Sequence, residues 1–227
     1  FNSGGQSIGI TQSQNVTNFQ GANLVGNPYP SYIDWGTLNG TYGAVYYWNG
    51  LGYDSWSSSG GSGSQYIAPL QGFFIVKTAE VSATHLNLGA GNRINRVSGT
   101  YYKSAEAGLS NSLVLRTESG SYSDKLYIVF NPETTEGFDL ANDAFKLTNS
   151  SGISTLYSYS GDTKLSIDAR PETETLQLGF YNTNSGQYQI GIQDIADIPV
   201  VVLEDTKTKA FHDLKNGSYT FNYDAGE

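Results

Sequence analysis

Cysteine and methionine are both absent from the 227 residues of this chain, and histidine occurs only twice. The lack of cysteine excludes thiolate nucleophiles, disulfide frameworks and cysteine-ligated zinc. Because a chain of this length can bury a large core, it needs no disulfides for stability, even outside the cell. Since the chain starts at Phe1 and has no methionine, we expect it to be a processed or excised piece of a larger protein.

Long apolar runs and basic clusters are also missing. The longest apolar stretch, residues 198–203, is far shorter than the roughly 20 residues of a membrane-spanning helix. No basic segment precedes an apolar one, so no signal peptide is found. The net charge is −9, and the 12 Lys and Arg residues are spread along the chain. Nucleic acids and anionic membranes attract clustered cations, so we predict neither nucleic-acid binding nor membrane insertion.

The residues that are plentiful suit strands and turns. The chain has 27 Gly, 17 Tyr and many Ser, Thr and Asn. Tyr and Thr favour half-buried strands, whereas Gly, Asn and Ser favour turns. Only 15% of the residues are charged, which is typical of surface β proteins rather than cytosolic enzymes. Composition therefore favours an extracellular or cell-surface location.

Alternating apolar and polar residues recur in short segments along the chain. They predict strands at residues 6–11, 22–26, 44–48, 72–77, 84–88, 113–115, 126–130, 144–147, 155–157, 165–167, 176–180, 188–192, 200–203, 210–211 and 219–223. Residues 182–186 are predicted to be a hairpin loop, and 138–147 is the best candidate for a short helix. We predict an all-β fold made of two packed antiparallel β-sandwich units, immunoglobulin-like or jelly-roll-like.

Charge is distributed unevenly between the two parts of the chain. Residues 1–97 contain three basic and three acidic residues, whereas 98–227 contain nine basic and eighteen acidic ones. All three tryptophans lie in the first part. We therefore predict an aromatic-rich, charge-neutral β domain at 1–97 and an acidic β-sandwich domain at 98–227, with one large sandwich as the alternative. Residues 57–64, with the sequence SSSGGSGS, are predicted to form a mobile loop tip.

Catalytic arrangements are not found. His212 and Asp213 are neighbours in an alternating segment, so their side chains should point to opposite faces of a strand. Glycosidases use two carboxylates about 5–10 Å apart, and turns of this chain contain several acidic residues. These are Glu133, Glu136, Asp139, Asp143, Glu204 and Asp205. Nothing in the sequence marks one of them as buried in an apolar pocket, so we predict a protein that is not an enzyme and has no cofactor.

Oxygen ligands around Asp139 and Asp143 raise the alternative of calcium binding. The spacing of an EF-hand is absent, however, and Asp139 can instead cap a short helical turn over 140–145. We favour the cap, and we predict no metal site.

Aromatic residues gather in one segment, which includes Tyr46, Trp48, Tyr53 and Trp56. Aromatic rings provide large contact areas at little entropic cost and stack on the apolar faces of sugars. Strand alternation places Tyr46 and Trp48 on one face, with residues 45 and 47 on the other, and one of these faces should belong to the core. The alternatives are a core-packing segment and a glycan-binding platform formed by these four residues.

Ordered motifs along nearly the whole chain resemble a known β module. They are LVGNPYPSYIDW at 24–35, VYYWNG at 45–50, IAPLQGFF at 67–74, FD at 138–139, DAFKL at 143–147, LY at 156–157, LGF at 178–180, VLED at 202–205, DL at 213–214 and YTF at 219–221. The set resembles the β-sandwich module that precedes the C-terminal sorting domain in large type IX-secreted surface proteins of Bacteroidetes. Most of these residues also have structural explanations, such as turns at the two prolines and core positions for Trp35 and Phe73.

The resemblance implies a non-catalytic structural or adhesive module of a secreted or cell-surface protein. Its implied partner is the type IX secretion machinery, reached through segments outside this chain, together with an extracellular glycan or surface protein. The alternative function is a carbohydrate-binding module that uses the aromatic platform.

Overall fold

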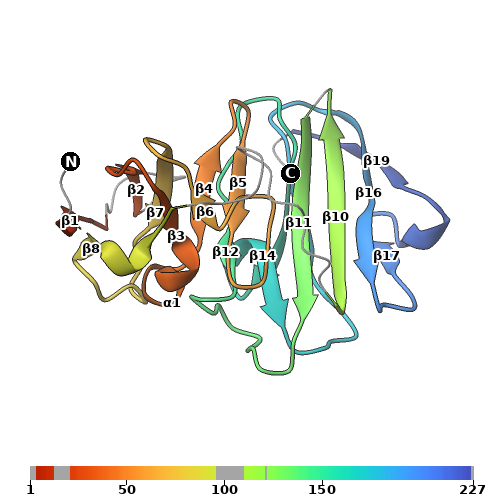
Figure 1. Cartoon of the computed structure of the whole chain (residues 1–227). Coiled ribbons are helices and arrows are strands. Elements are labelled where there is room, and N and C mark those ends of the chain that lie inside the picture. Colours follow the sequence, from red (N-terminus) through yellow and green to blue (C-terminus); the bar gives the residue numbers. More distant parts are fainter. Residues whose placement is uncertain (1–3, 13–20, 96–109, 121, 226–227) are drawn as a thin grey trace.

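The computed structural model describes residues 4–12, 21–95, 110–120 and 122–225. Strands are the main regular structure of the described chain, and its helices are only short turns (Figure 1). The predicted all-β class is confirmed, and each predicted strand range overlaps an observed strand. None of the helices in these ranges has the length and apolar character needed to cross a membrane.

Sheets from the first part of the chain lie at one end of the molecule (Figure 1). A four-stranded sheet has the order β2 (Ala22–Gly26), β7 (Gly72–Val76), β4 (Val45–Trp48), β5 (Tyr53–Trp56). A three-stranded sheet has the order β6 (Tyr66–Ile67), β3 (Tyr32–Asp34), β9 (Arg93–Ile94), and β1 (Gln6–Gly9) pairs with β8 (His85–Leu88). The helical turns here are the 3₁₀ helices η1 (Trp35–Thr37) and η2 (Ala90–Asn92) and the helix α1 (Asn39–Tyr42).

An eight-stranded sheet dominates the second part. Its main path is β15 (Leu178–Tyr181), β13 (Thr155–Ser160), β14 (Thr163–Arg170), β11 (Tyr122–Phe130), β10 (Ser112–Ser119), β16 (Gly186–Ala196), β19 (Tyr219–Tyr223), and β12 (Ala144–Phe145) also pairs with β14. The hairpin of β17 (Val202–Asp205) and β18 (Ala210–Asp213) and the 3₁₀ helix η3 (Leu214–Asn216) complete this part. All its pairs are antiparallel except β11 with β14, which are parallel because the chain crosses over through β12 and β13 between them.

The large sheet curls until its two end strands face each other. Phe180 on β15 lies with its ring centroid 5.0 Å from those of Phe221 and Tyr223 on β19. Residues 182–186 were expected to form a hairpin loop, and that prediction is wrong, because β15 pairs with β13 while β16 pairs with β10 and β19. The loop instead crosses between opposite ends of the curled sheet. The strands that it joins meet through the rings of Phe180 and Tyr188 rather than through backbone hydrogen bonds.

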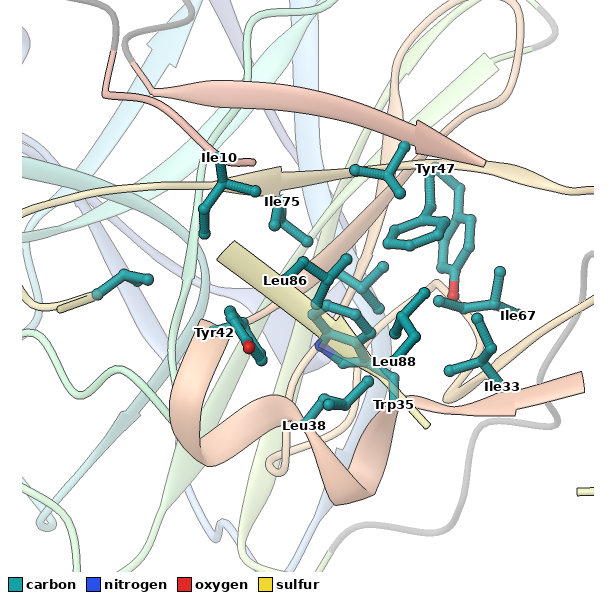
Figure 2. Close-up of a cluster of buried hydrophobic side chains, with 14 of the residues drawn as sticks. Ile10, Ile33, Trp35, Leu38, Tyr42, Tyr47, Ile67, Ile75, Leu86 and Leu88 are labelled. Atoms are coloured by element: carbon teal, nitrogen blue, oxygen red, sulfur yellow. The ribbon is translucent and has the colours of Figure 1, made fainter. Parts of the chain in front are cut away.

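Three buried clusters explain how the sheets are layered. In the first cluster Trp35 packs among aliphatic and aromatic side chains, as Figure 2 shows. Residues 45 and 47 of β4 and 73 and 75 of β7 face this cluster, whereas residues 46 and 76 face the second one. The second cluster also contains side chains of the large sheet: Val114, Tyr127, Ala144, Leu147 and Ile167. The third lies inside the curl of the large sheet.

The four-stranded sheet is therefore buried on both faces in its centre, and it contacts the large sheet through the second cluster. In the described ranges every sheet takes its strands from one side of the predicted boundary near residue 97, yet the second core cluster spans it. The division into two domains stays a prediction.

Two local predictions fail. Residues 138–147 do not form a helix: a turn at 140–142 is followed by β12, because Ala144 is buried and pairs with Ile167. Residues 57–64 were predicted to form a mobile loop tip, but they are largely packed against the rest of the molecule. Ser57, Ser59, Gly61 and Gly63 are buried, and only the second residue of the segment is exposed.

Candidate functional site

The four aromatic residues predicted to form a platform have different surroundings. Tyr46 is only 2% exposed, and its hydroxyl accepts a hydrogen bond from the amide of Phe145 at 2.8 Å. Burial raises its pKa far above the usual range of a tyrosine. Alternation along β4 was expected to leave one face free, but Tyr47 on the opposite face is buried as well. Tyr46 therefore joins the two sheets instead of presenting its ring to solvent.

Trp48 and Tyr53 are the two platform residues that lie together near the surface. They are opposite each other on β4 and β5, with ring centroids 5.0 Å apart, and Trp48 is 45% exposed. The ring of Tyr53 also meets that of Phe74 on β7 edge to face, at 5.6 Å. Leu24 on β2 lies opposite Phe74 in the sheet and is 69% exposed. We call Leu24, Trp48, Tyr53 and Phe74 the aromatic strip.

Trp56 belongs to a different environment. It is half-buried and packs against the first core cluster. Since Tyr53 and Trp56 are three positions apart on β5, their side chains point to opposite faces of the sheet. The structure thus brings together two of the four predicted residues.

Polar groups hold the tip of the β4–β5 hairpin next to the strip. The side-chain oxygen of Asn49 accepts hydrogen bonds from the amides of Leu51 and Gly52, at 3.2 and 2.9 Å. Its amide nitrogen donates to a carboxylate oxygen of Asp54 at 3.1 Å. This fixed tip places amide and carboxylate groups beside partly exposed rings, the combination that small-molecule and sugar sites use for orientation and contact.

Asp139 and Asp143 hold a loop in place. The carboxylate of Asp139 accepts from the amide of Ala141 at 3.0 Å and from the side chain of Asn142 at 2.9 Å. Asp143 accepts from the amides of Asp139 and Ala169, at 2.7 and 2.8 Å. Asp139 therefore caps the turn at 140–142, as predicted, although the turn does not continue as a helix.

All four carboxylate oxygens of this aspartate pair already accept a hydrogen bond from the protein. Among the residues that the structure describes, no three His, Cys, Asp or Glu side chains are grouped closely enough to hold a metal ion. Burial raises the pKa of Asp143 to about 7, and the nearby carboxylates of Asp168 and Asp139 add to the rise, against the two amide donors. The arrangement fits a structural role for the pair.

The remaining acid–base candidates either have structural partners or are exposed. His212 has its Nε2 2.9 Å from the carbonyl oxygen of Gly217, while Asp213 accepts from the amide of Lys215 and from the side chain of Asn216. Asp205 accepts from the hydroxyl of Tyr219 at 2.8 Å and from two backbone amides of its turn. Glu133, Glu136 and Glu204 are exposed.

Comparison with known proteins gives one family. Residues 37–227 match DUF8693, a domain of unknown function. The chain belongs to the DUF8693 family. The match begins at η1 and runs to the end of the chain, so it includes both the hairpin that carries Trp48 and Tyr53 and the whole eight-stranded sheet.

One relative of known name is a fimbrial protein. The DUF8693 chain is 28% identical, over 261 aligned residues, to the minor fimbrium subunit Mfa5 of Porphyromonas gingivalis strain ATCC 33277. The alignment covers 97% of this chain and 21% of Mfa5, so the chain spans about a fifth of the relative's length. No solved structure matches the chain.

Sequence reasoning missed two members of the aromatic strip in this DUF8693 chain. Leu24 and Phe74 lie about 50 residues apart in sequence and become neighbours only through the pairing of β2 with β7. An apolar residue inside a predicted strand is normally assigned to the core. The exposed position of Leu24 could therefore not be distinguished from that of the buried Val25 beside it.

Proposed function

We propose that this chain is a non-catalytic structural or adhesive module of a larger protein on the cell surface, exported by type IX secretion. The observation that carries the proposal is the similarity to a fimbrium subunit along 97% of the chain. Two further features support it. The acidic side chains considered for catalysis are exposed or have structural hydrogen-bond partners, and the molecule consists of sheets packed in layers.

Surface labelling of intact cells tests this proposal. Antibodies raised against the purified chain are expected to label intact cells that produce the parent protein, without permeabilisation. In a strain that lacks the type IX translocon, the label should disappear from intact cells and return only after permeabilisation. Labelling that always requires permeabilisation would contradict a surface location. Surface labelling that persists in the translocon mutant would remove the type IX part alone.

The aromatic strip supports a second function, glycan binding. Trp48, Tyr53 and Phe74 form a continuous row of rings, with Leu24 extending it across the sheet. Flat, partly exposed rings offer apolar contact to sugar faces, and Asn49 and Asp54 provide hydrogen-bonding groups for hydroxyls nearby. A glycan that binds at the aromatic strip would then be the target of an adhesive module.

Glycan arrays with matched variants test the second function. We expect the wild type to bind one class of glycan and Trp48→Ala to weaken that binding about tenfold, because it removes one ring from the contact. Phe211→Ala is the control, since Phe211 is an exposed aromatic residue on the distant β18. Melting temperatures should stay close to wild type in both variants. If the wild type binds no glycan, or if both variants lose binding equally, the strip is not a glycan site.

A further inference from the structure

Residues 57–64 connect the first part of the molecule to the second. The hydroxyl of Ser57 donates to the carbonyl oxygen of Asn142 at 2.7 Å, and the amide of Ser58 donates to the carbonyl oxygen of Ala141 at 3.0 Å. The Ser59 hydroxyl donates to the side-chain oxygen of Asn142 at 3.3 Å. Three consecutive serines thus bind the loop that precedes β12, more than 80 residues later in the chain. We call residues 57–64 the clasp.

Asn39 on α1 strengthens the same connection from the side. Its side-chain nitrogen donates to the carbonyl oxygen of Ala141 at 2.6 Å and to the hydroxyl of Ser58 at 2.7 Å. Next to the clasp, the hydroxyls of Ser55 on β5 and Ser166 on β14 lie 3.0 Å apart and are buried. Because buried hydroxyls and amides are costly to leave without partners, separating the two parts would leave these groups either unpaired or exposed to solvent.

The glycines of the clasp have a packing role. A Cβ atom on Gly61 would lie 2.2 Å from the carbonyl oxygen of Ser55 and 2.7 Å from the Cδ1 atom of Ile167, and the residue has a φ angle of +131°. A Cβ atom on Gly63 would lie 2.9 Å from the carbonyl carbon of Ser55 and 3.1 Å from the ring of Tyr47. Only glycine allows the backbone to approach the neighbouring strands this closely. The Ser/Gly composition is therefore explained by close contact and not by mobility.

The second core cluster lies beside the clasp. There Tyr46 and Val76 of the four-stranded sheet pack with Val114, Tyr127 and Ile167 of the large sheet. Figure 1 shows β4 and β5 beside β12 and β14. The contact between the two sheets therefore has an apolar centre, formed by the second core cluster, and a hydrogen-bonded margin, formed by the clasp.

We infer that residues 57–64 are an internal clasp that couples the four-stranded sheet to the eight-stranded sheet, so that the two parts unfold as one cooperative unit. The coupling does not depend on where the protein works or on what it binds. If the chain is a structural module, as the function proposed above has it, a pulling force would act on the two parts as one unit.

The placement of the tryptophans provides a probe for this coupling. Trp35, Trp48 and Trp56 all lie in the first part, so their emission reports the unfolding of that part alone. Most strand residues lie in the second part, so far-UV circular dichroism reports mainly that part. In urea, the two signals of the wild type are expected to change with the same midpoint.

Gly61→Ala is the variant that should break the coupling, and Gly50→Ala is its matched control. Both glycines have positive φ angles, +131° and +102°, but a Cβ atom on Gly50 meets nothing within 4 Å. We expect Gly61→Ala to lower the urea midpoint by about 1 M more than the control, with tryptophan emission changing before circular dichroism. The control should keep coincident transitions. Ser57→Ala removes the hydroxyl that donates to Asn142 and accepts from the amide of Ser59. It should give a smaller shift in the same direction and serves if Gly61→Ala does not fold.

Separate transitions in the wild type would overturn the inference. So would coincident transitions in both clasp variants with midpoints equal to that of Gly50→Ala. Neither result would bear on surface location, which the labelling experiment tests separately.

Discussion

Replacing Lys146 with methionine is expected to lower the free energy of unfolding by about 3–5 kcal/mol, because it leaves a buried carboxylate without its counter-charge. The Nζ atom of Lys146 lies 2.6 and 2.7 Å from the two carboxylate oxygens of Asp124, and the side chains are only 4% and 3% exposed. Asp124 also accepts a hydrogen bond from the amide of Leu156 at 2.7 Å, so this residue of β11 is linked both to β13 and to Lys146, which directly follows β12. Urea unfolding at pH 7 measures the loss.

Two further variants separate this effect from general damage. Arg116 and Glu118 form an exposed ion pair at 3.2 Å, so Arg116→Ala should cost less than about 0.5 kcal/mol. The double variant Lys146→Met with Asp124→Leu removes both charges and should be more stable than Lys146→Met alone. A single Lys146→Met variant within about 1 kcal/mol of the wild type would show that the pair is not a major support of the fold.

Much of the strand pattern can be predicted from the sequence, because alternation reports burial directly. The ranges 22–26 and 219–223 coincide with β2 and β19, and the predicted core residues Trp35 and Phe73 are fully buried. Short strands without alternation were missed. The strand β5 is one example: its sequence YDSW interrupts the apolar pattern because Asp54 lies at a polar hairpin tip.

Contacts between distant segments are what the sequence could not supply. A Ser/Gly-rich stretch indicates flexibility unless its partners are known, and the partners of residues 57–59 lie at 141 and 142. In the same way, two alternating segments joined by a five-residue connection indicate a hairpin. In the large sheet, however, β15 is the first strand of the order and β16 is the last but one, and only the curl of the sheet brings them back together.

The candidate site was predicted in part, for a related physical reason. Alternation correctly separates the two faces of β4, but it does not reveal that a second sheet covers one of them around Tyr46. The extent of the area covered by the large sheet determines which rings of β4 stay at the surface. Trp48 lies beyond it, at the end of the strand, and Tyr46 lies under it.

Asp143 makes the stability of the protein depend on pH near neutrality. Its pKa is raised from an ordinary 3.8 to about 7, chiefly by burial. The groups that face it are Asp139 in its own loop, Asp168 on β14, which is paired with Arg170, and the hydroxyl of Tyr46 on β4. The folded state therefore binds a proton that the unfolded state releases between about pH 4 and pH 7.

The sign of the effect follows from this proton balance. Where the folded state holds more protons than the unfolded state, the free energy of unfolding falls as the pH rises. The contribution of Asp143 is therefore fully present below about pH 4, is lost as the pH rises through about 7, and is constant above that. The displacement of the pKa corresponds to at most roughly 4 kcal/mol.

Asp143→Asn is expected to remove this dependence and to destabilise the fold at every pH. Both oxygens of Asp143 accept backbone amides, whereas asparagine offers one oxygen and turns its own N–H groups towards the other amide. The difference in unfolding free energy between wild type and variant should therefore shrink as the pH rises from 4 to 8. Leu147→Ala, a cavity in the second core cluster, keeps the carboxylate and should cost about 2–4 kcal/mol at every pH. Urea titrations across this range decide: parallel wild-type and Asp143→Asn curves would show that the carboxylate does not titrate between pH 4 and 8 in the folded protein.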